Sequence, residues 1–485
     1  MSYKVLDPLD SAFVTLEVPG APLHIGVIIE MDVPDDGLDS KQRFEVLRAN
    51  IAARLHEIPV LTKRVLRTPF DLAWPVLAED PDFDINAHVI RRAVTSPGGE
   101  EQLDALVARV MSRELAPDRP LWELNYIEGL ADGRAAIVMK VHHALADGVS
   151  GAATFAGLFD LSPEVRQPEP PQNVPAPDPL PTPLELLGRT GSELLKRPAA
   201  LLEVLGAALE RAADLVEGAA ESLAGREDES HQPSIFQAKT TSINGTPGYA
   251  KQFKRLRVDL VEVKRAAKSR GVSVTDFVMA SVSGGLRRLF EARGELLEAD
   301  LVAFVPISVR REGAEGEMGN QISAMLSELR ADIEDPEERI VTIAASSKAS
   351  AQLQREKSAQ LLMNLANAAG PTVASVAGRS LAALQLFEHL PPVANLTVSS
   401  VPGPPIPLWL SGHQVRTVAP LGPLMAGLAL NVTVISYCEN LEFGLLACAR
   451  KVPELAALRD MIEEEVNYYL KAPAPGVELT PGEVG

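Results

Sequence analysis

Residues 134–148 read RAAIVMKVHHALADG, a stretch that joins an apolar strand to two histidines and an aspartate. The run 135–141 is uncharged except for one lysine and predicts a buried strand. An Asp-Gly pair at 132–133 is a strong signal of a tight hairpin turn, and the run 124–128 predicts the partner strand. The histidine pair therefore stands at a strand end, where side chains can meet a substrate.

These residue types suit an acyl-transfer site. A hydroxyl that attacks a thioester carbonyl needs a base to take its proton, and a histidine does this at neutral pH. We predict that His143 is this general base. Asp147 would order the turn or orient the imidazole, and Gly148 would allow close approach of the substrate. His142 is a site candidate whose role stays open.

A metal site and a purely structural histidine pair are the alternative interpretations. The chain has eight histidines, and the six outside the pair form no cluster with ligand spacing, so no metal ion is expected. Ser150 lies in a sequence close to the Gly-x-Ser-x-Gly nucleophile elbow, but the last position fails and no separate strand precedes it. Direct attack by the acceptor hydroxyl is therefore favoured over an acyl-enzyme.

Further blocks surround the histidines in a fixed order. They are Leu6–Phe13 (LDPLDSAF), Phe83–Val89 (FDINAHV), Arg119–Glu123 (RPLWE), Val305–Arg310 (VPISVR) with Gly319-Asn320, Asn395–Pro404 (NLTVSSVPGP) and Leu430–Tyr437 (LNVTVISY). Together with HHxxxDG they resemble the bacterial wax ester synthase/acyl-CoA:diacylglycerol acyltransferase family over almost the whole chain. The resemblance implies an α/β, two-domain fold like that of chloramphenicol acetyltransferase, with a tunnel between the domains and the HxxxD histidine near its middle.

Two blocks depart from the usual family pattern. Thr275-Asp276 stands where the family commonly has Asn-Asp at the start of a long helix, and Ser399-Ser400 stands where it has Ser-Asn. Each change replaces an amide with a hydroxyl, which shortens the reach and removes one donor. Substrate preference and rate are the properties that these changes would alter. Thr275 could instead serve only as a helix cap.

The tetrahedral oxyanion of acyl transfer needs hydrogen-bond donors. Asn395, Thr397 and Ser399 alternate along one face of a predicted strand, so their side chains could converge on it. Ordinary hydrogen bonding within the sheet is the alternative for each. Trp122 is expected in the core, and Arg310 is either a partner of Asp147 or a surface charge.

Composition indicates a large protein with an aliphatic core. A chain of 485 residues favours two domains, and 46% hydrophobic residues with only 5% aromatic ones make base-stacking platforms improbable. The net charge of −19 argues against nucleic acid as a partner and against broad adhesion to anionic lipid. Only two cysteines occur, and residues 1–7 lead into no apolar signal segment, so we expect a protein of the cytoplasm.

Prolines crowd between Leu161 and Pro183 and predict an extended linker. We therefore divide the chain into a first domain at 1–162 with HHxxxDG, a linker with bridging helices at 163–235, and a second domain at 236–485. The apolar helix expected near 201–215 either bridges the domains or lies on a membrane or lipid droplet. The uncharged stretch 417–438 is interrupted by proline and glycine, which predicts a loop followed by a strand and no membrane span.

The resemblance and the motif lead to one function. We expect an acyltransferase that uses long-chain acyl-CoA to make triacylglycerol from diacylglycerol, or wax esters from fatty alcohols, without metal or bound cofactor. The alternatives are a different specialised lipid alcohol as acceptor, and a catalytically weak lipid-binding protein. Peripheral contact with the inner membrane face or with lipid droplets follows from the acceptors, and the oligomeric state is not specified by the sequence.

Overall fold

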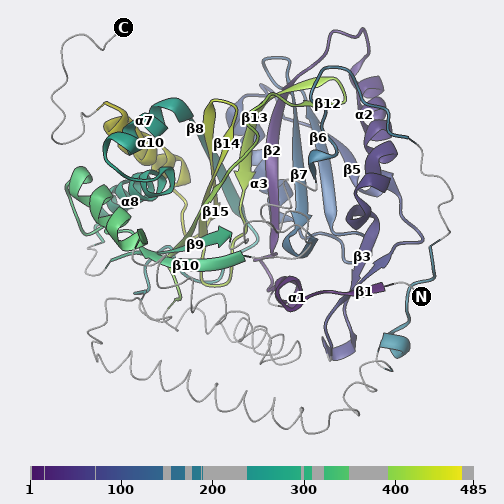
Figure 1. Cartoon of the computed structure of the whole chain (residues 1–485), viewed down its shortest axis with the longest axis horizontal. Coiled ribbons are helices and arrows are strands. Elements are labelled where there is room, and N and C mark those ends of the chain that lie inside the picture. The colour runs from purple at the N-terminus through teal and green to yellow at the C-terminus, as the bar shows by residue number, and fades with distance from the viewer. Residues whose placement is uncertain are drawn as a thin grey trace.

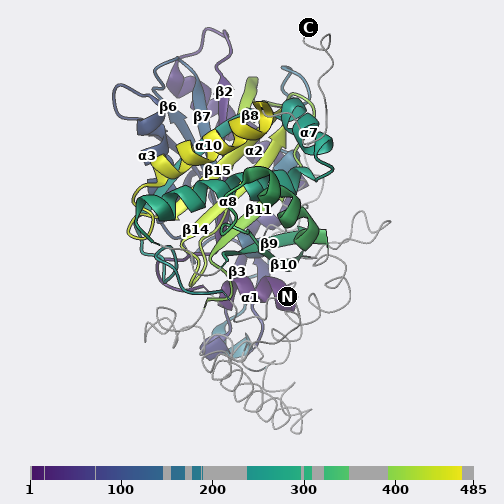
Figure 2. The same ribbon diagram turned by 90° about the vertical axis from the view of Figure 1, so that its left-hand side faces the viewer.

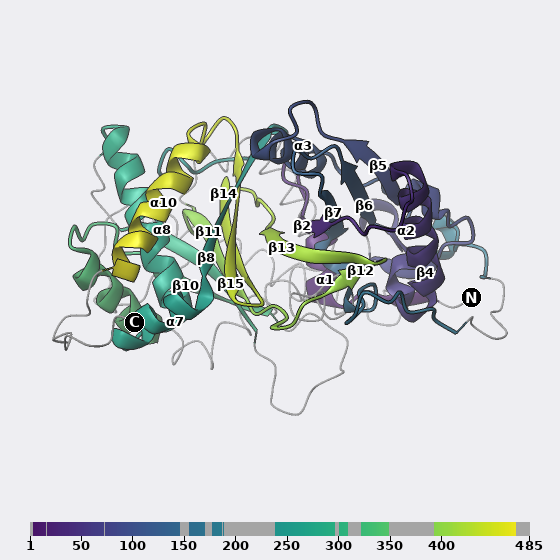
Figure 3. The same cartoon turned by 90° about the horizontal axis from the view of Figure 1, so that it is seen from above.

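The structure is a computed structural model that describes residues 3–15, 17–71, 73–145, 155–169, 177–186, 188, 238–295, 300–308, 322–348 and 392–471. Within these ranges the strands form two six-stranded sheets and one three-stranded sheet. The two large sheets stand side by side with helices on their outer faces (Figures 1 and 3). The predicted two-domain α/β class is therefore confirmed.

The helices have these bounds: α1 (Pro8–Thr15), α2 (Ser40–Arg54), α3 (Glu100–Ser112), α7 (Leu260–Ser269), α8 (Val274–Ala292), α10 (Leu455–Lys471), and the short 3₁₀ turns η1 (Leu55–Glu57), η2 (Pro59–Thr62), η3 (Pro69–Asp71), η4 (Ile85–Ala87) and η5 (His143–Leu145). Residues 336–348 are also helical. The sequence predicts a long helix from 334 to about 390; residues 336–348 confirm part of it, and residues 349–391 lie outside the described residues. The helix expected near 201–215 lies outside them too.

The first large sheet contains the predicted hairpin. Its order is β12 (Trp409–Leu410), β13 (His413–Leu421), β2 (His24–Asp32), β7 (Ala135–His142), β6 (Trp122–Glu128) and β5 (Val89–Ala93). β6 and β7 pair antiparallel, and Gly133 takes φ +77° in the turn between them. Every residue of β7 is buried, because α2 packs on one face of the sheet and α3 on the other. A separate three-stranded sheet has the order β1 (Tyr3–Val5), β4 (Val76–Glu79) and β3 (Lys63–Leu66).

The second large sheet has the order β10 (Ile322–Glu328), β9 (Val302–Ser308), β11 (Leu396–Val401), β14 (Leu430–Tyr437), β15 (Asn440–Cys448) and β8 (Lys251–Asp259). Helices α7, α8 and α10 cover its outer face (Figure 2), where Phe277, Val432 and Ile462 share one apolar cluster. α8 and α10 approach closely at Gly284 and Gly285, where a side chain would collide with Glu465 and Ile462. The sequence also predicts strands near 301–306, 428–437 and 441–446, and β9, β14 and β15 confirm them.

The first large sheet includes a strand from beyond the predicted domain boundary. β13 comes from the second half of the chain, yet it pairs antiparallel with β2 from Gln414↔Asp32 to Leu421↔Gly26. The division at residue 236 therefore does not separate the two sheets. It also follows that residues 417–421 are strand, and the loop predicted there is wrong. No helix among the residues described here is long and apolar enough to span a bilayer.

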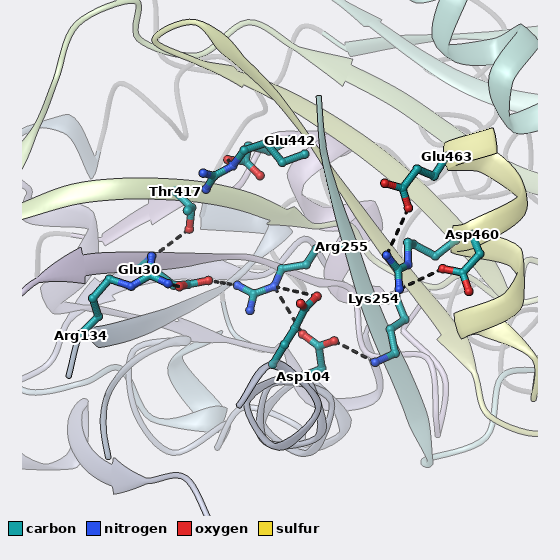
Figure 4. A network of polar contacts seen from close by, with 12 residues as sticks. Glu30, Asp104, Arg134, Lys254, Arg255, Thr417, Glu442, Asp460 and Glu463 are labelled. Carbon is teal, nitrogen blue, oxygen red and sulfur yellow. Dashed lines mark hydrogen bonds and ion pairs between the residues drawn. The ribbon is translucent and has the colours of Figure 1, made fainter. Parts of the chain in front are cut away.

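A network of buried charges ties the sheets together where α3 lies between them (Figure 4). Arg255 on β8 forms ion pairs with Glu30 on β2 and, at 3.6 Å, with Asp104 on α3. Lys254 reaches Asp104 at 3.0 Å, and Arg134 reaches Glu30 at 3.0 Å. The side chains of Glu30 and Asp104 are only 7% and 3% exposed. The network therefore fixes how the halves meet.

Candidate active site

The turn after β7 carries the histidine pair, as predicted. The N–H of His142 donates to the carbonyl of Leu121 at 2.9 Å, which continues the sheet to its last residue. The N–H of His143 donates to the carbonyl of Leu23 at 2.9 Å, and the chain then enters η5. The backbone of the candidate base is therefore held from the loop before β2.

The ring of His143 stacks on Phe13 of α1. The two ring centroids are 3.9 Å apart and the planes differ by 19°. Both residues are only half-buried, so part of His143 is accessible. The block Leu6–Phe13 contributed to the family resemblance, but no local pattern predicts that its phenylalanine stacks on the histidine ring.

His142 has a different environment from its neighbour. It is 3% exposed, and its Nδ1 accepts the N–H of Ala144 at 3.2 Å. A neutral ring that accepts at Nδ1 carries its proton on Nε2. That Nε2 lies 3.6 Å from Oε1 of Glu17 and makes no hydrogen bond among the described residues. His142 therefore holds the turn, and Glu17 is a residue that sequence reasoning missed.

Basic groups line the sheet behind the histidines. His24 is the cross-strand neighbour of His142, and its Nε2 lies 2.9 Å from the carbonyl oxygen of Met111. Burial, with Lys140 nearby, holds the pKa of His24 well below its ordinary value. Burial also lowers the pKa of Lys140, whose Nζ donates to the carbonyl of Arg113 at 2.9 Å. The ring of His24, beside His142, is therefore held in its neutral form.

Asp147 and Gly148 lie outside the described residues, as do Ser150 and Arg310. Their predicted roles stay predictions.

The three candidate residues at and just before β11 differ in their hydrogen bonding. Asn395 accepts the N–H of Val302 at 2.8 Å, and its amide donates to the carbonyl of Lys239 at 2.8 Å and to Oδ1 of Asn244 at 2.9 Å. Both amide hydrogens are thus used inside the fold, and the residue is fully buried. The prediction that Asn395 donates to an oxyanion is therefore wrong, because it has no donor left.

Thr397 and Ser399 remain candidates. Leu396 and Val398 belong to the cluster under the helices, so alternation turns Thr397 and Ser399 to the face toward the first sheet. The hydroxyl of Thr397 is buried and has no hydrogen-bond partner among the described residues. Ser399 is half-buried. A buried hydroxyl without a partner is uncommon, which suits a group that meets a ligand.

Thr275 and Asp276, which the sequence makes candidates for contact with substrate, lie in the first turn of α8. Ser273 is the N-cap, and its hydroxyl accepts the N–H of Asp276 at 3.1 Å. The Asp276 carboxylate in turn accepts the N–H and the hydroxyl of Ser273, at 3.0 and 2.7 Å. Thr275 lies within the first turn, so its interpretation as a cap is wrong. Asp276 is committed to this capping box, which favours a structural role over contact with substrate.

Two of the sequence blocks meet in the first domain. His88 stacks between Phe83 and Trp122, with ring centroids 5.0 and 4.6 Å away. Nδ1 of His88 lies 2.9 Å from the carbonyl oxygen of Trp122, and the indole donates to the carbonyl of Leu61 at 2.7 Å. Trp122 is 1% exposed, which confirms that it lies in the core. These blocks therefore support β6, next to the strand that carries the histidines.

Comparison with known proteins finds matches to one family along most of the chain. Residues 6–278 match the wax ester synthase/diacylglycerol acyltransferase catalytic domain, and residues 318–468 match the C-terminal domain of that family. A putative diacylglycerol O-acyltransferase of Mycobacterium tuberculosis is 30% identical over 96% of this chain and 90% of its own length. A probable diacylglycerol O-acyltransferase of the same species is 32% identical over 95% of this chain and 97% of its own.

Solved structures share the fold. The wax ester synthase/diacylglycerol acyltransferase from Marinobacter aquaeolei aligns with a TM-score of 0.69 and 25% identity over 96% of this chain and 98% of its own. The first condensation domain of the calcium-dependent antibiotic synthetase aligns with a TM-score of 0.54 at 16% identity, over 98% of this chain and 97% of its own. The second likeness concerns the fold alone and agrees with the expected chloramphenicol-acetyltransferase-like architecture.

Proposed function

This chain belongs to the wax ester synthase/diacylglycerol acyltransferase family and is an acyltransferase, and we propose that it transfers a long-chain acyl group from coenzyme A to diacylglycerol or a fatty alcohol. The observation that carries the proposal is His143, fixed through its backbone to Leu23 and stacked on Phe13 at the end of β7. A ring held in this way can act as a base for a hydroxyl placed beside it.

The proposed reaction is a direct transfer. His143 takes the proton of the acceptor hydroxyl as its oxygen attacks the thioester carbonyl. The tetrahedral intermediate then expels the thiolate of coenzyme A, which recovers the proton from the imidazolium. Thr397 is our candidate donor to the oxyanion, because its buried hydroxyl has no partner among the described residues. These steps involve no metal or bound cofactor.

The acceptors imply where the enzyme works. Diacylglycerol and long-chain alcohols partition into membranes and lipid droplets, so we expect peripheral binding to such surfaces. Co-sedimentation with vesicles that contain diolein measures this binding directly, and vesicles without diolein are the control.

Product analysis tests the proposal. Protein incubated with palmitoyl-CoA and either diolein or hexadecanol should form an ester and release thiol in equal amounts. Thiol release without ester would indicate hydrolysis, and neither product would favour lipid binding alone. His143→Ala should lower ester formation by about 10²- to 10⁴-fold, the usual contribution of a general base. His56→Ala, at an exposed histidine, is the matched control and should keep full activity. Full activity in His143→Ala would refute the mechanism.

A further inference from the structure

Glu17 lies at the centre of the contacts that hold the catalytic turn. Its Oε1 accepts the N–H of Leu23 at 3.2 Å and lies 3.6 Å from Nε2 of His142. The carbonyl of the same Leu23 accepts the N–H of His143, and Nδ1 of His142 accepts the N–H of Ala144. One carboxylate therefore faces two groups, and each group binds the backbone of the turn.

The proton position on His142 makes this arrangement directional. Because Nδ1 is an acceptor, the N–H is on Nε2, and Oε1 of Glu17 faces it at 3.6 Å, a polar contact longer than a hydrogen bond. Removing the carboxylate would leave this buried N–H without the oxygen that faces it, so the ring would turn or change tautomer. Either change would release the N–H of Ala144 within η5.

The loop that carries Glu17 is fixed by the second half of the chain. Gly20 has φ +82°, and a side chain there would collide with the carbonyl of Pro247. Nζ of Lys251, on β8, donates to the carbonyl of Gly20 at 3.3 Å. Val18 and Ala21 bridge each other within the loop. Glu17 is thus presented to His142 by a loop with little freedom to move.

We propose that Glu17 is a positioning residue for His143. Its carboxylate holds the His142 ring and the Leu23 amide, and these two groups together fix the turn. This role rests on the proposed function, since it concerns the positioning of the same base. It requires the position of the carboxylate oxygen more than its charge, because Oε1 accepts the N–H of Leu23 and faces Nε2 of His142.

Steady-state kinetics of two substitutions test the proposal. Glu17→Ala should lower kcat by about 10- to 100-fold with little change in KM for palmitoyl-CoA, because a misplaced base affects the chemical step. Glu17→Gln should restore kcat to near the wild-type value, because its amide oxygen can still accept the N–H of Leu23 and face Nε2 of His142. Wild-type kcat in Glu17→Ala, or a Glu17→Gln variant no better than Glu17→Ala, would overturn the proposal.

A matched control separates positioning from stability. Asp259 also accepts backbone N–H groups, those of Val261 and Glu262 at 2.7 and 3.0 Å, but it caps α7 on the surface. Asp259→Ala should lower the melting temperature and leave kcat unchanged. A fall in kcat in this variant equal to that of Glu17→Ala would show that lost stability alone explains the result, and would overturn the proposal.

A measurement without substrate keeps the two proposals distinct. Protein labelled with ¹⁵N-histidine should show the ring of His142 with its proton on Nε2 in the wild type and in Glu17→Gln, with the signals assigned by His142→Gln. Glu17→Ala should lose this single form, and an unchanged spectrum would overturn the role of Glu17. If the wild type makes no ester with any acceptor, only the proposed function fails, and these ring signals still decide the role of Glu17.

Discussion

The free energy of unfolding of Glu442→Gln, minus that of the wild type, is predicted to be larger at high pH than at low pH. The Glu442 carboxyl is on β15 (Figure 4). It lies close to Arg257, whose Nε donates to it at 2.7 Å. Its side chain is 3% exposed. Burial raises the pKa of Glu442 to about 7, with Arg257 opposing the shift.

The magnitude follows from the difference in pKa between the folded and unfolded states. A rise from 4.5 to about 7 means that the folded protein binds this proton more tightly, so stability is highest below pH 4.5 and falls as pH rises to about 7. The full effect is about 3.4 kcal/mol, and about 2 kcal/mol of it falls between pH 5.5 and pH 8. Glutamine resembles the protonated form and lacks this loss.

Urea unfolding of both proteins at pH 5.5 and pH 8 measures the effect. The free energy of unfolding of Glu442→Gln, minus that of the wild type, should rise by about 2 kcal/mol between the two pH values. Glu291→Gln, at a side chain that is 57% exposed, is the control and should show no such rise. A difference that stays constant with pH, or that favours the wild type at pH 8, would refute the reasoning.

Two further predictions concern single contacts. Thr397→Val should lower kcat by about 10²- to 10³-fold, as for a lost oxyanion donor, while the melting temperature stays unchanged because the hydroxyl has no partner among the described residues; wild-type kcat in an ester-formation assay would exclude this role. Gly284→Ala should lower the free energy of unfolding by about 1–3 kcal/mol, because its methyl group would collide with Glu465, which is 1% exposed and paired with Arg339. Urea unfolding measures this loss, and unchanged stability would show that α10 can move aside.

Local patterns in the sequence predicted the elements that carry the site. The hairpin of β6 and β7 follows from an apolar run and an Asp-Gly turn, both within about twenty residues. The position of His143 at the strand end follows from the same pattern. The helical spacing of Leu103, Leu106, Val107, Val110 and Met111 likewise predicts α3.

Contacts between distant residues could not be predicted in this way. Phe13 and Glu17 meet the histidine pair across more than a hundred residues, and no spacing rule connects them. Asn395 looked like a free donor because its alternation with Thr397 and Ser399 was visible, whereas its partners on other segments were not. The sequence allows either Ser273 or Thr275 as the helix cap, because both residue types suit that position and only the backbone geometry decides between them.

The position of β13 in the first sheet also bears on how this chain could be divided or assembled. β2 is an interior strand only because β13 covers its edge. A polypeptide that stopped before residue 236 would expose the backbone of β2 as an unpaired edge, which other chains can pair with. The two halves should therefore be more soluble and fold better together than apart. Co-expression of two fragments could rebuild the enzyme through strand complementation.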